Sequence, residues 1–527
     1  MKDIITNIYT FEDLIQGNFL YVDKTEYIWQ LIRPAKEMYF LSRPRRFGKS
    51  LTVSTLKAVF EGKKELFQGF ALYDKPYDWQ VHPVIQLDMN GRDFRTLDAM
   101  EESFRLILQE QADFNKVTLK ERTANAMFHE LIKTLHDTKG DVVILLDEYD
   151  KPILNNISKP DCRDFLDALK TFYSVIKEKN AMIRLAFITG VSKFCHVSLF
   201  SELNNLTDIT MDSRFATMLG YTQEEVEANF GDRIDALAGK QHPDEFMQEI
   251  KKWYNGYRFE ENAPSVYNPV SLAQFIKSGG KFNNYWFSTG TPTFLLDLMK
   301  SQRFDFEKVL NAPVSNFAFD AFEIDRIPPL TLLIQAGYLT IDSAVQRFGG
   351  TAYRLRFPNL EVKDSFDTHL AGYCSGLQSS EVKDSVYQLA DAVTAGDVDG
   401  FMETMKVFFA KVPYDVHLKD ENNFQLLFFS IFMLLGISIT AESRTNQGRI
   451  DAVAANEDFV FVFEFKLDKS RETALEQIKE RDYYRRYMNS GKKILLVGVN
   501  FDSELGQIQD WVVEGCNKGV PRIIDLQ

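Results

Sequence analysis

The 527-residue sequence predicts an α/β protein built on a parallel sheet, with a second α/β region near the C-terminus. Three observations support this fold class. Apolar residues precede the segment 42–50 and helically spaced ones follow it, which indicates a strand, a loop and a helix. The apolar run 142–146 is typical of a strand buried on both faces of a parallel sheet. Residues 448–466 read as a β-hairpin, with strands at 450–454 and 459–466 and a turn at 456–458.

Composition limits the class of protein further. A hydrophobic content of 45% with 26% charged residues is globular, and the length predicts two to four domains. The four cysteines form no C-x-x-C pair and the seven histidines no H-E-x-x-H pattern, which argues against zinc and disulfides. A net charge of -14 argues against a surface coated for nucleic acid, although a local basic groove is compatible with it.

The sequence predicts no membrane segment. The N-terminus carries acidic residues and lacks the apolar region of a signal peptide. The longest apolar run, 426–439, is interrupted by Ser430 and Gly436 and is shorter than the ~20 residues of a membrane helix. We interpret this run as a buried helix leading into a strand, and we expect a cytoplasmic protein.

The segment "SRPRRFGKS" at 42–50 ends as a nucleotide-binding P-loop does, in Gly48-Lys49-Ser50, but Arg43 stands where the G-x-x-x-x-G-K-[ST] pattern has its first glycine. The following helix would offer N–H groups to phosphate, Lys49 would reach the β and γ oxygens, and Ser50 would bind Mg²⁺. A basic turn before an ordinary helix explains the loop alone equally well. The predicted nucleotide-binding residues of this loop are Arg45, Arg46, Phe47, Gly48, Lys49, Ser50 and Leu51.

The stretch "DVVILLDEYD" at 141–150 ends its apolar run in Asp147-Glu148, as a Walker B strand does. Asp147 would hold Mg²⁺ through water or through Ser50, and Glu148 would orient or deprotonate the attacking water. The alternative is a buried strand that simply leaves the sheet with polar residues. Further strands are predicted at 83–91 and 182–192, the second ending in Thr189, with helices near 96–111 and 123–136.

This order of strands is that of the P-loop NTPases with a catalytic glutamate. The chain resembles the AAA-ATPase-like proteins abundant in gut Bacteroidetes. The matching segments are "YVDKTEYI" at 21–28, "FLSRPRRFGKSL" at 40–51, "LLDEYDKPI" at 145–153 and "ITGVSKF" at 188–194. In that family arginine also replaces the first P-loop glycine. The resemblance implies ATP as ligand, residues 1–210 as the ATPase domain, and Thr189 as a sensor of the γ-phosphate.

Residues 211–375 carry less chemistry. "WYNGYRF" at 253–259 reads as a tight turn flanked by aromatic side chains. "LTLLIQAGYLTI" at 330–341 predicts a helix, a glycine break and a strand, as in a small winged-helix unit. We interpret this region as a helical lid that packs on the nucleotide and the ATPase core rather than as a reader of DNA.

The C-terminal hairpin carries a second set of reactive side chains. Glu464 and Lys466 are two apart on one predicted strand and therefore share a face, and Asp451 lies on the preceding strand. Such a set is typical of PD-(D/E)xK nucleases, in which two carboxylates bind Mg²⁺ or Mn²⁺ and the lysine steadies the attacking water. Everyday salt bridges on a strand face are the alternative.

Residues 376–527 resemble the nuclease-like domain commonly fused to this ATPase, with a restriction-endonuclease-like α/β fold. The resemblance implies Glu421 as a further metal ligand and places Gln477, Tyr483 and Tyr487 on a helix over 474–487. Residues 471–493 hold seven Lys/Arg against four Asp/Glu, which suits a phosphate backbone. Gln425, where related chains have histidine, is a departure that bears on metal affinity.

The sequence thus yields one hypothesis, one alternative, and a third possibility in which the arginine-rich loop binds nucleotide without turnover. In the first, ATP binding or hydrolysis regulates a Mg²⁺- or Mn²⁺-dependent nuclease domain that acts on DNA or RNA. In the second, the protein is a nucleotide-dependent switch or scaffold whose catalytically silent nuclease fold binds nucleic acid or a protein partner. The oligomeric state stays open.

Overall fold

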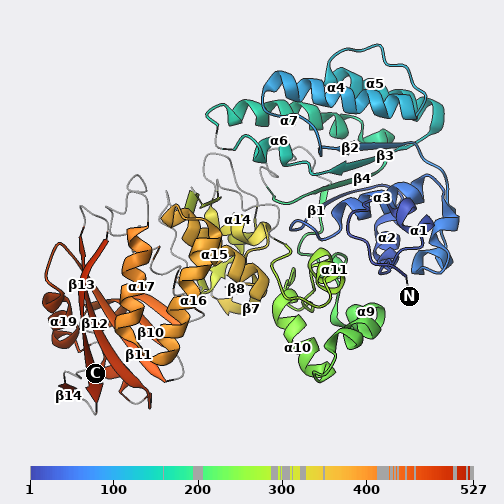
Figure 1. The fold of residues 1–527 in the computed structure, drawn as a ribbon. Helices are drawn as coiled ribbons and strands as arrows, with labels where there is room; N and C mark the ends of the chain where they lie inside the picture. Colours follow the sequence, from blue (N-terminus) through green and yellow to red (C-terminus); the bar gives the residue numbers. More distant parts are fainter. Residues whose placement is uncertain are drawn as a thin grey trace. The chain divides into compact units, whose positions relative to one another are not determined.

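The computed structural model divides the chain into two compact units, Met1–Gly290 with Val309–Val362 and Thr291–Lys308 with Lys363–Gln527 (Figure 1). Each unit is described by itself. The residues described are 2–157, 159–193, 206–286, 295–296, 298–299, 309–310, 312–320, 328–347, 350–411, 427, 431, 435, 438–445, 448–455, 458–482, 484–488, 490–502, 507–517 and 520–522.

The first unit contains a five-stranded sheet of order β2-β3-β4-β1-β5 in which every neighbouring pair is parallel. Its strands are β1 (Glu37–Ser42), β2 (Val84–Asp88), β3 (Val142–Asp147), β4 (Ile183–Gly190) and β5 (Leu206–Asp208). All six residues of β3 are buried, as expected for a strand covered on both faces. The strand predicted before the segment 42–50 and those predicted at 83–91, 142–146 and 182–192 are therefore confirmed.

Helices cover both faces of this sheet. The chain moves from β1 to β2 in one direction along the sheet and returns from β2 through β3 to β4 in the other. Right-handed crossovers therefore place α3 (Lys49–Phe60) on one face and α4 (Leu97–Phe114), α5 (Ala124–Lys139) and α7 (Cys162–Glu178) on the other, as Figure 1 shows. Short helices α1 (Phe11–Gln16), α2 (Thr25–Ile32) and α6 (Lys151–Leu154) complete this part.

The rest of the first unit has two small parts. Helices α9 (Gln223–Ala238), α10 (Pro243–Tyr254) and α11 (Pro269–Lys277) share an apolar core that includes Phe230, Ile250 and Phe275. Helix α14 (Pro329–Gln335) and the antiparallel strands β6 (Val314–Ser315), β7 (Thr340–Arg347) and β8 (Gly350–Arg356) follow. The predicted helix, glycine break and strand over 330–341 are confirmed; the lid role stays a prediction.

The second unit is built on a six-stranded sheet of order β14-β13-β12-β11-β10-β9. Only β11 and β12 pair in parallel, and α19 (Arg471–Glu480) connects them. The strands are β9 (Ser438–Thr445), β10 (Gly448–Ala455), β11 (Phe459–Leu467), β12 (Lys493–Asp502), β13 (Gln507–Asn517) and β14 (Val520–Arg522); helices α16 (Ser379–Ala395) and α17 (Val398–Ala410) precede them. Helix α15 (Leu360–Ser375) begins at the end of the first unit. The predicted α/β fold class and the hairpin are confirmed.

One predicted element is wrong in extent. The helix expected over 474–487 ends at Glu480, because Asp482 takes a left-handed backbone with φ 51° and a 3₁₀ turn follows at Arg485–Tyr487. Tyr487 is therefore not on the helix of Gln477, and Tyr483 lies outside the described residues.

The structure describes little of the apolar run 426–439, and it leaves the domain ranges untested. Most of the apolar run 426–439 lies outside the described residues, although Leu427 and Ile431 are buried. Within the described part of the chain, no helix is long and apolar enough to cross a membrane. The three domain ranges stay a prediction.

Candidate nucleotide site and nuclease-like site

The phosphate loop lies between the carboxyl end of β1 and the start of α3. Gly48 adopts φ 96° at the loop's end, and a side chain at that position would meet no atom within 4 Å, so the backbone conformation and not the space requires glycine. Arg46 is left-handed as well, with φ 68°. The loop therefore turns sharply twice before α3, and it brings the free N–H groups of the helix start to the carboxyl edge of the sheet.

The Lys49 side chain folds back over this loop. Its Nζ donates to the carbonyl oxygens of Arg43 and Pro44, both at 3.0 Å, and the residue is 7% exposed. Burial lowers the pKa of the Lys49 ammonium, while the nearby carboxylates of Asp147 and Glu148 act in the opposite direction. A bound phosphate would offer Lys49 oxygens with more negative charge than these two carbonyls.

Asp147 ends β3 beside the loop. Burial raises the pKa of its carboxyl to about 6, against the hydrogen bond from the Ser50 side chain and the charge of Lys49. Its Oδ1 is buried and has no hydrogen-bond partner among the described residues. A buried, unpartnered carboxylate oxygen next to a serine hydroxyl is a hard donor pair that fits Mg²⁺. The predicted metal ligands Ser50 and Asp147 are therefore close together.

Glu148 follows Asp147 with a left-handed backbone, φ 54°. Its Oε2 lies 3.2 Å from Lys151 Nζ, which also donates to Asn90 Oδ1 at 2.6 Å. Lys151 thus connects Glu148 to the end of β2. Nothing in the sequence singles out Lys151 or Asn90, because both contacts arise only when β2 and β3 lie side by side.

The order of the strands in the sheet determines where Thr189 lies. Strand β4 lies between β1 and β3, and Leu41 pairs with Thr189 in register. The buried Thr189 hydroxyl donates to the Leu41 carbonyl at 2.8 Å. The predicted sensor residue is therefore located between the strand of the phosphate loop and the acidic strand.

Arg43, the residue in place of the first P-loop glycine, points into the protein. Its side chain is buried, with 1% exposure. The guanidinium donates to the carbonyl oxygens of Ser42, Thr210 and Phe215 at 2.9, 2.7 and 3.3 Å and lies 4.1 Å from the Phe259 ring. Burial lowers the pKa of Arg43 to about 9. The arginine in place of glycine therefore anchors the loop and does not face phosphate.

The other loop residues divide between solvent and protein. Arg45 is exposed, whereas Arg46 is half-buried and donates from Nη1 to the Tyr285 carbonyl at 2.9 Å. Phe47 is buried against the rings of Tyr257 and Phe259, with centroids 4.8 and 5.4 Å away. The predicted tight turn at 253–259 therefore packs on the loop.

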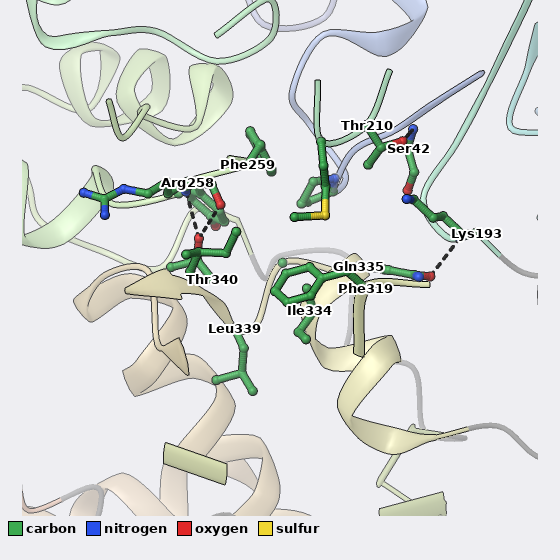
Figure 2. A pocket seen from close by; sticks show the side chains of 15 residues that line it. Ser42, Lys193, Thr210, Arg258, Phe259, Phe319, Ile334, Gln335, Leu339 and Thr340 are labelled. Atoms are coloured by element: carbon green, nitrogen blue, oxygen red, sulfur yellow. Dashed lines mark hydrogen bonds between the residues drawn. The ribbon is translucent and has the colours of Figure 1, made fainter. Parts of the chain in front are cut away.

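A cavity of about 50 Å³ lies behind the loop (Figure 2). The polar groups around it bond to one another: the Lys193 amide donates to Gln335 Oε1 at 2.8 Å, and the Arg258 amide to Thr340 Oγ1 at 2.8 Å. Phe259, Phe319 and Leu339 supply apolar walls. We interpret this cavity as a packing seam between the end of β1 and the α14–β7 segment.

The second candidate site lies on β11. Glu464 and Lys466 alternate along the strand, and Lys466 Nζ lies 2.8 Å from Glu464 Oε1. Gln477 of α19 donates from Nε2 to the same oxygen. Glu464 is 1% exposed, so its carboxyl is held inside the unit by two donors from two elements. Three predicted catalytic residues therefore meet at one atom.

The remaining predicted ligands are less defined. The β10–β11 register pairs Ala452 with Phe463, which places the backbone of Asp451 next in line to that of Glu464; its side chain is not described. Glu421 and Gln425 lie outside the described residues. Within the described part of the chain, no three His, Cys, Asp or Glu side chains form a group that could hold a metal ion.

Gly498 allows α19 to pack closely against β12. It pairs in register with Glu464, and an added Cβ would lie 2.5 Å from the Arg471 carbonyl oxygen and 2.8 Å from the Leu475 nitrogen. Only glycine lets the helix approach β12 this closely. Sequence reasoning missed Gly498, because nothing in "LLVGVNF" marks a contact with a helix.

The first unit has the parallel-sheet order and loop of a P-loop NTPase, and the second a mixed sheet with an acidic-x-Lys strand. A model described as predicted AAA-ATPase matches residues 6–200, and one of the PD-(D/E)XK nuclease superfamily matches residues 419–511. An uncharacterized protein in the vnfD 5' region of Azotobacter chroococcum mcd 1 is 38% identical over 526 residues, covering 97% of this chain and 99% of the relative. The chain belongs to the predicted AAA-ATPase family. The expected family is confirmed, and the Bacteroidetes type stays a prediction.

Two solved structures show weaker similarity. The ORC2 protein of Aeropyrum pernix, in ADPNP-ADP complexes, is 12% identical, with a TM-score of 0.27 over 67% of this chain and 90% of that one. Cdc6p of Pyrobaculum aerophilum is 12% identical, with a TM-score of 0.22 over 69% and 92%. Scores this low carry no argument. The two matched family models support a nucleotide-binding protein with a nuclease-like domain.

Proposed function

We propose that this protein binds ATP with Mg²⁺ at the phosphate loop, hydrolyses it, and thereby regulates a metal-dependent nuclease-like domain acting on DNA or RNA. One observation carries the proposal. The Lys49 ammonium, the Ser50 side chain and the buried Asp147 carboxyl meet at the carboxyl edge of the sheet. This set provides a cation for the β and γ phosphates and two oxygen ligands for Mg²⁺.

Hydrolysis assigns roles to the neighbouring residues. Glu148 accepts the proton of the attacking water, and its ion pair with Lys151 holds it until substrate binds. Thr189 senses the γ-phosphate from the strand between β1 and β3. Arg45, Arg46, Phe47, Gly48 and Leu51 complete the nucleotide site. Bound Mg²⁺ would neutralise charge on the β and γ phosphates.

The nuclease step assigns roles in the second unit. Asp451, Glu464 and Glu421 would bind the cation, and Lys466 and Gln477 orient the water and the scissile phosphate. Mg²⁺ or Mn²⁺ there would act as a Lewis acid on the phosphodiester. We further propose functional segments at 1–210, 211–375 and 376–527, and a location in the cytoplasm.

A second function deserves a test. Lys466 and Gln477 both donate to Glu464 Oε1, so a cation at this oxygen competes with both of them. This contact favours a silent nuclease fold that binds nucleic acid or a protein partner under control of the nucleotide.

Cleavage assays decide between the two. Purified protein is incubated with supercoiled plasmid, single-stranded DNA or RNA, with Mg²⁺ or Mn²⁺, with and without ATP. We expect cleavage that Lys466→Ala abolishes, that Lys49→Ala uncouples from ATP, and that the control Lys469→Ala retains. ATP binding without any cleavage would establish the switch or scaffold instead.

Phosphate release tests the ATPase step separately. Glu148→Gln should bind ATP as wild type does and lose hydrolysis by a factor of about 10² to 10⁴, the usual contribution of a general base. Equal turnover in Glu148→Gln and wild type would remove Glu148 from the reaction.

A further inference from the structure

The phosphate loop is connected to a buried carboxylate that its own chemistry does not use. Glu361, in the first turn of α15, is fully buried. Its Oε1 accepts the backbone N–H of Tyr285 at 2.7 Å and of Trp286 at 2.8 Å. A buried carboxylate needs such donors, because an uncompensated charge in the interior is costly.

Arg46 of the phosphate loop contacts the Tyr285–Trp286 segment as well, at a carbonyl oxygen and not at an N–H group. Its guanidinium donates to the Tyr285 carbonyl, whose residue gives its N–H to Glu361. The positive charge of Arg46 also acts on the Glu361 carboxyl and opposes the rise of its pKa to about 7 that burial causes. Loop, Tyr285–Trp286 backbone and Glu361 thus form one charged chain of contacts inside the first unit.

The chain of contacts ends at the places where the polypeptide leaves this unit. The first unit is interrupted after Gly290, five residues beyond Tyr285, and ends at Val362, the residue after Glu361. Both exits lead directly into the second unit.

Arg46 is also two residues before Gly48, at the loop that would bind the triphosphate. Its left-handed backbone costs about 1 kcal/mol and is held in place by the surrounding structure. A triphosphate carries more negative charge than one carboxylate and a carbonyl dipole, so it competes with them for the guanidinium.

We propose that Arg46 exchanges the Tyr285 carbonyl and the field of Glu361 for the nucleotide phosphates, and that this exchange loosens the Tyr285–Trp286 segment at the exits toward the second unit. The proposal rests on nucleotide binding at the phosphate loop. It names the group through which nucleotide occupancy would act on the nuclease-like unit. Arg46 would contact the nucleotide directly, and its effect on the second unit would pass through the Tyr285–Trp286 backbone.

Hydrogen–deuterium exchange measures this loosening directly. The full-length protein is compared with and without Mg²⁺ and a non-hydrolysable ATP analogue, at pH 8. We expect the Tyr285 and Trp286 amides to exchange on the order of tenfold faster with the analogue, as for the loss of one charge-assisted hydrogen bond. Arg46→Ala should show this faster exchange without nucleotide and no further change with it. Glu361→Gln, which keeps an acceptor oxygen but no charge, should show the faster exchange in part.

Arg122→Ala is the control, because it removes the same charge from the same unit at an exposed position outside the phosphate loop. It should keep the nucleotide-dependent change wherever the analogue is bound. Calorimetric titration of the analogue keeps the two proposals apart. If wild type does not bind it, the proposed function fails. If wild type binds it but the two amides exchange alike in every state and variant, the exchange of Arg46 is refuted.

Discussion

The two candidate sites are built in different ways. The nucleotide site collects groups from loops at the ends of three parallel strands, and Arg46, Gly48 and Glu148 there all have left-handed backbones. The nuclease-like site takes Glu464 and Lys466 from alternate positions of one strand and Gln477 from the helix above it, with ordinary backbones at all three. A loop site depends on distant packing to hold its shape, whereas a strand site inherits its shape from the β pleat.

The largest test of this contrast is Arg43→Gly, which restores the glycine that a P-loop usually has. It leaves the carbonyls of Ser42, Thr210 and Phe215 without their donor, and we expect a loss of about 3 to 5 kcal/mol in unfolding free energy. Chemical denaturation followed by fluorescence measures it. The exposed neighbour Arg45→Gly should cost far less. A variant Arg43→Gly as stable as wild type would contradict the anchoring role.

Measuring the unfolding free energy as a function of pH sharpens the contrast, because it isolates the contribution of the buried Glu361 carboxyl. The pKa of Glu361 is raised to about 7 from 4.5, so the folded state binds this proton more tightly than the unfolded state. Its contribution to stability is full below pH 4.5, falls as pH rises toward 7, and is constant above. We expect wild type to lose up to about 3 kcal/mol relative to Glu361→Gln over this interval. If the unfolding free energies of wild type and Glu361→Gln changed with pH in the same way, a buried Glu361 charge would be excluded.

The smallest expected effect concerns the strand site. Gly498→Ala would push a methyl group into the backbone of α19, at a cost of about 1 to 3 kcal/mol. It would also move Gln477 away from Glu464. Denaturation of the variant measures the cost, and Gly231→Ala, a helical glycine with open space around it, is the control that should be neutral or stabilising. Equal behaviour of the two variants would show that α19 adapts freely.

The sequence predicted the elements better than the contacts. Apolar runs located β1 to β4 because a buried parallel strand needs such a run, and the β11 alternation located Glu464 and Lys466 on one face. The role of Arg43 was not predictable, since its acceptors Thr210 and Phe215 are brought to it only by the fold. The early end of α19 was missed because no glycine or proline marks Asp482.

The buried guanidinium of Arg43 has a practical consequence for protein expression. The matched ATPase model ends at residue 200, yet Arg43 is bonded to Thr210 and Phe215 and stacked on Phe259. A fragment cut at residue 200 would contain the whole loop 42–50 and none of these three partners. Any soluble fragment that keeps this loop in shape has to continue past residue 259, so its boundary should be chosen from the arginine's partners and not from the end of the motif match.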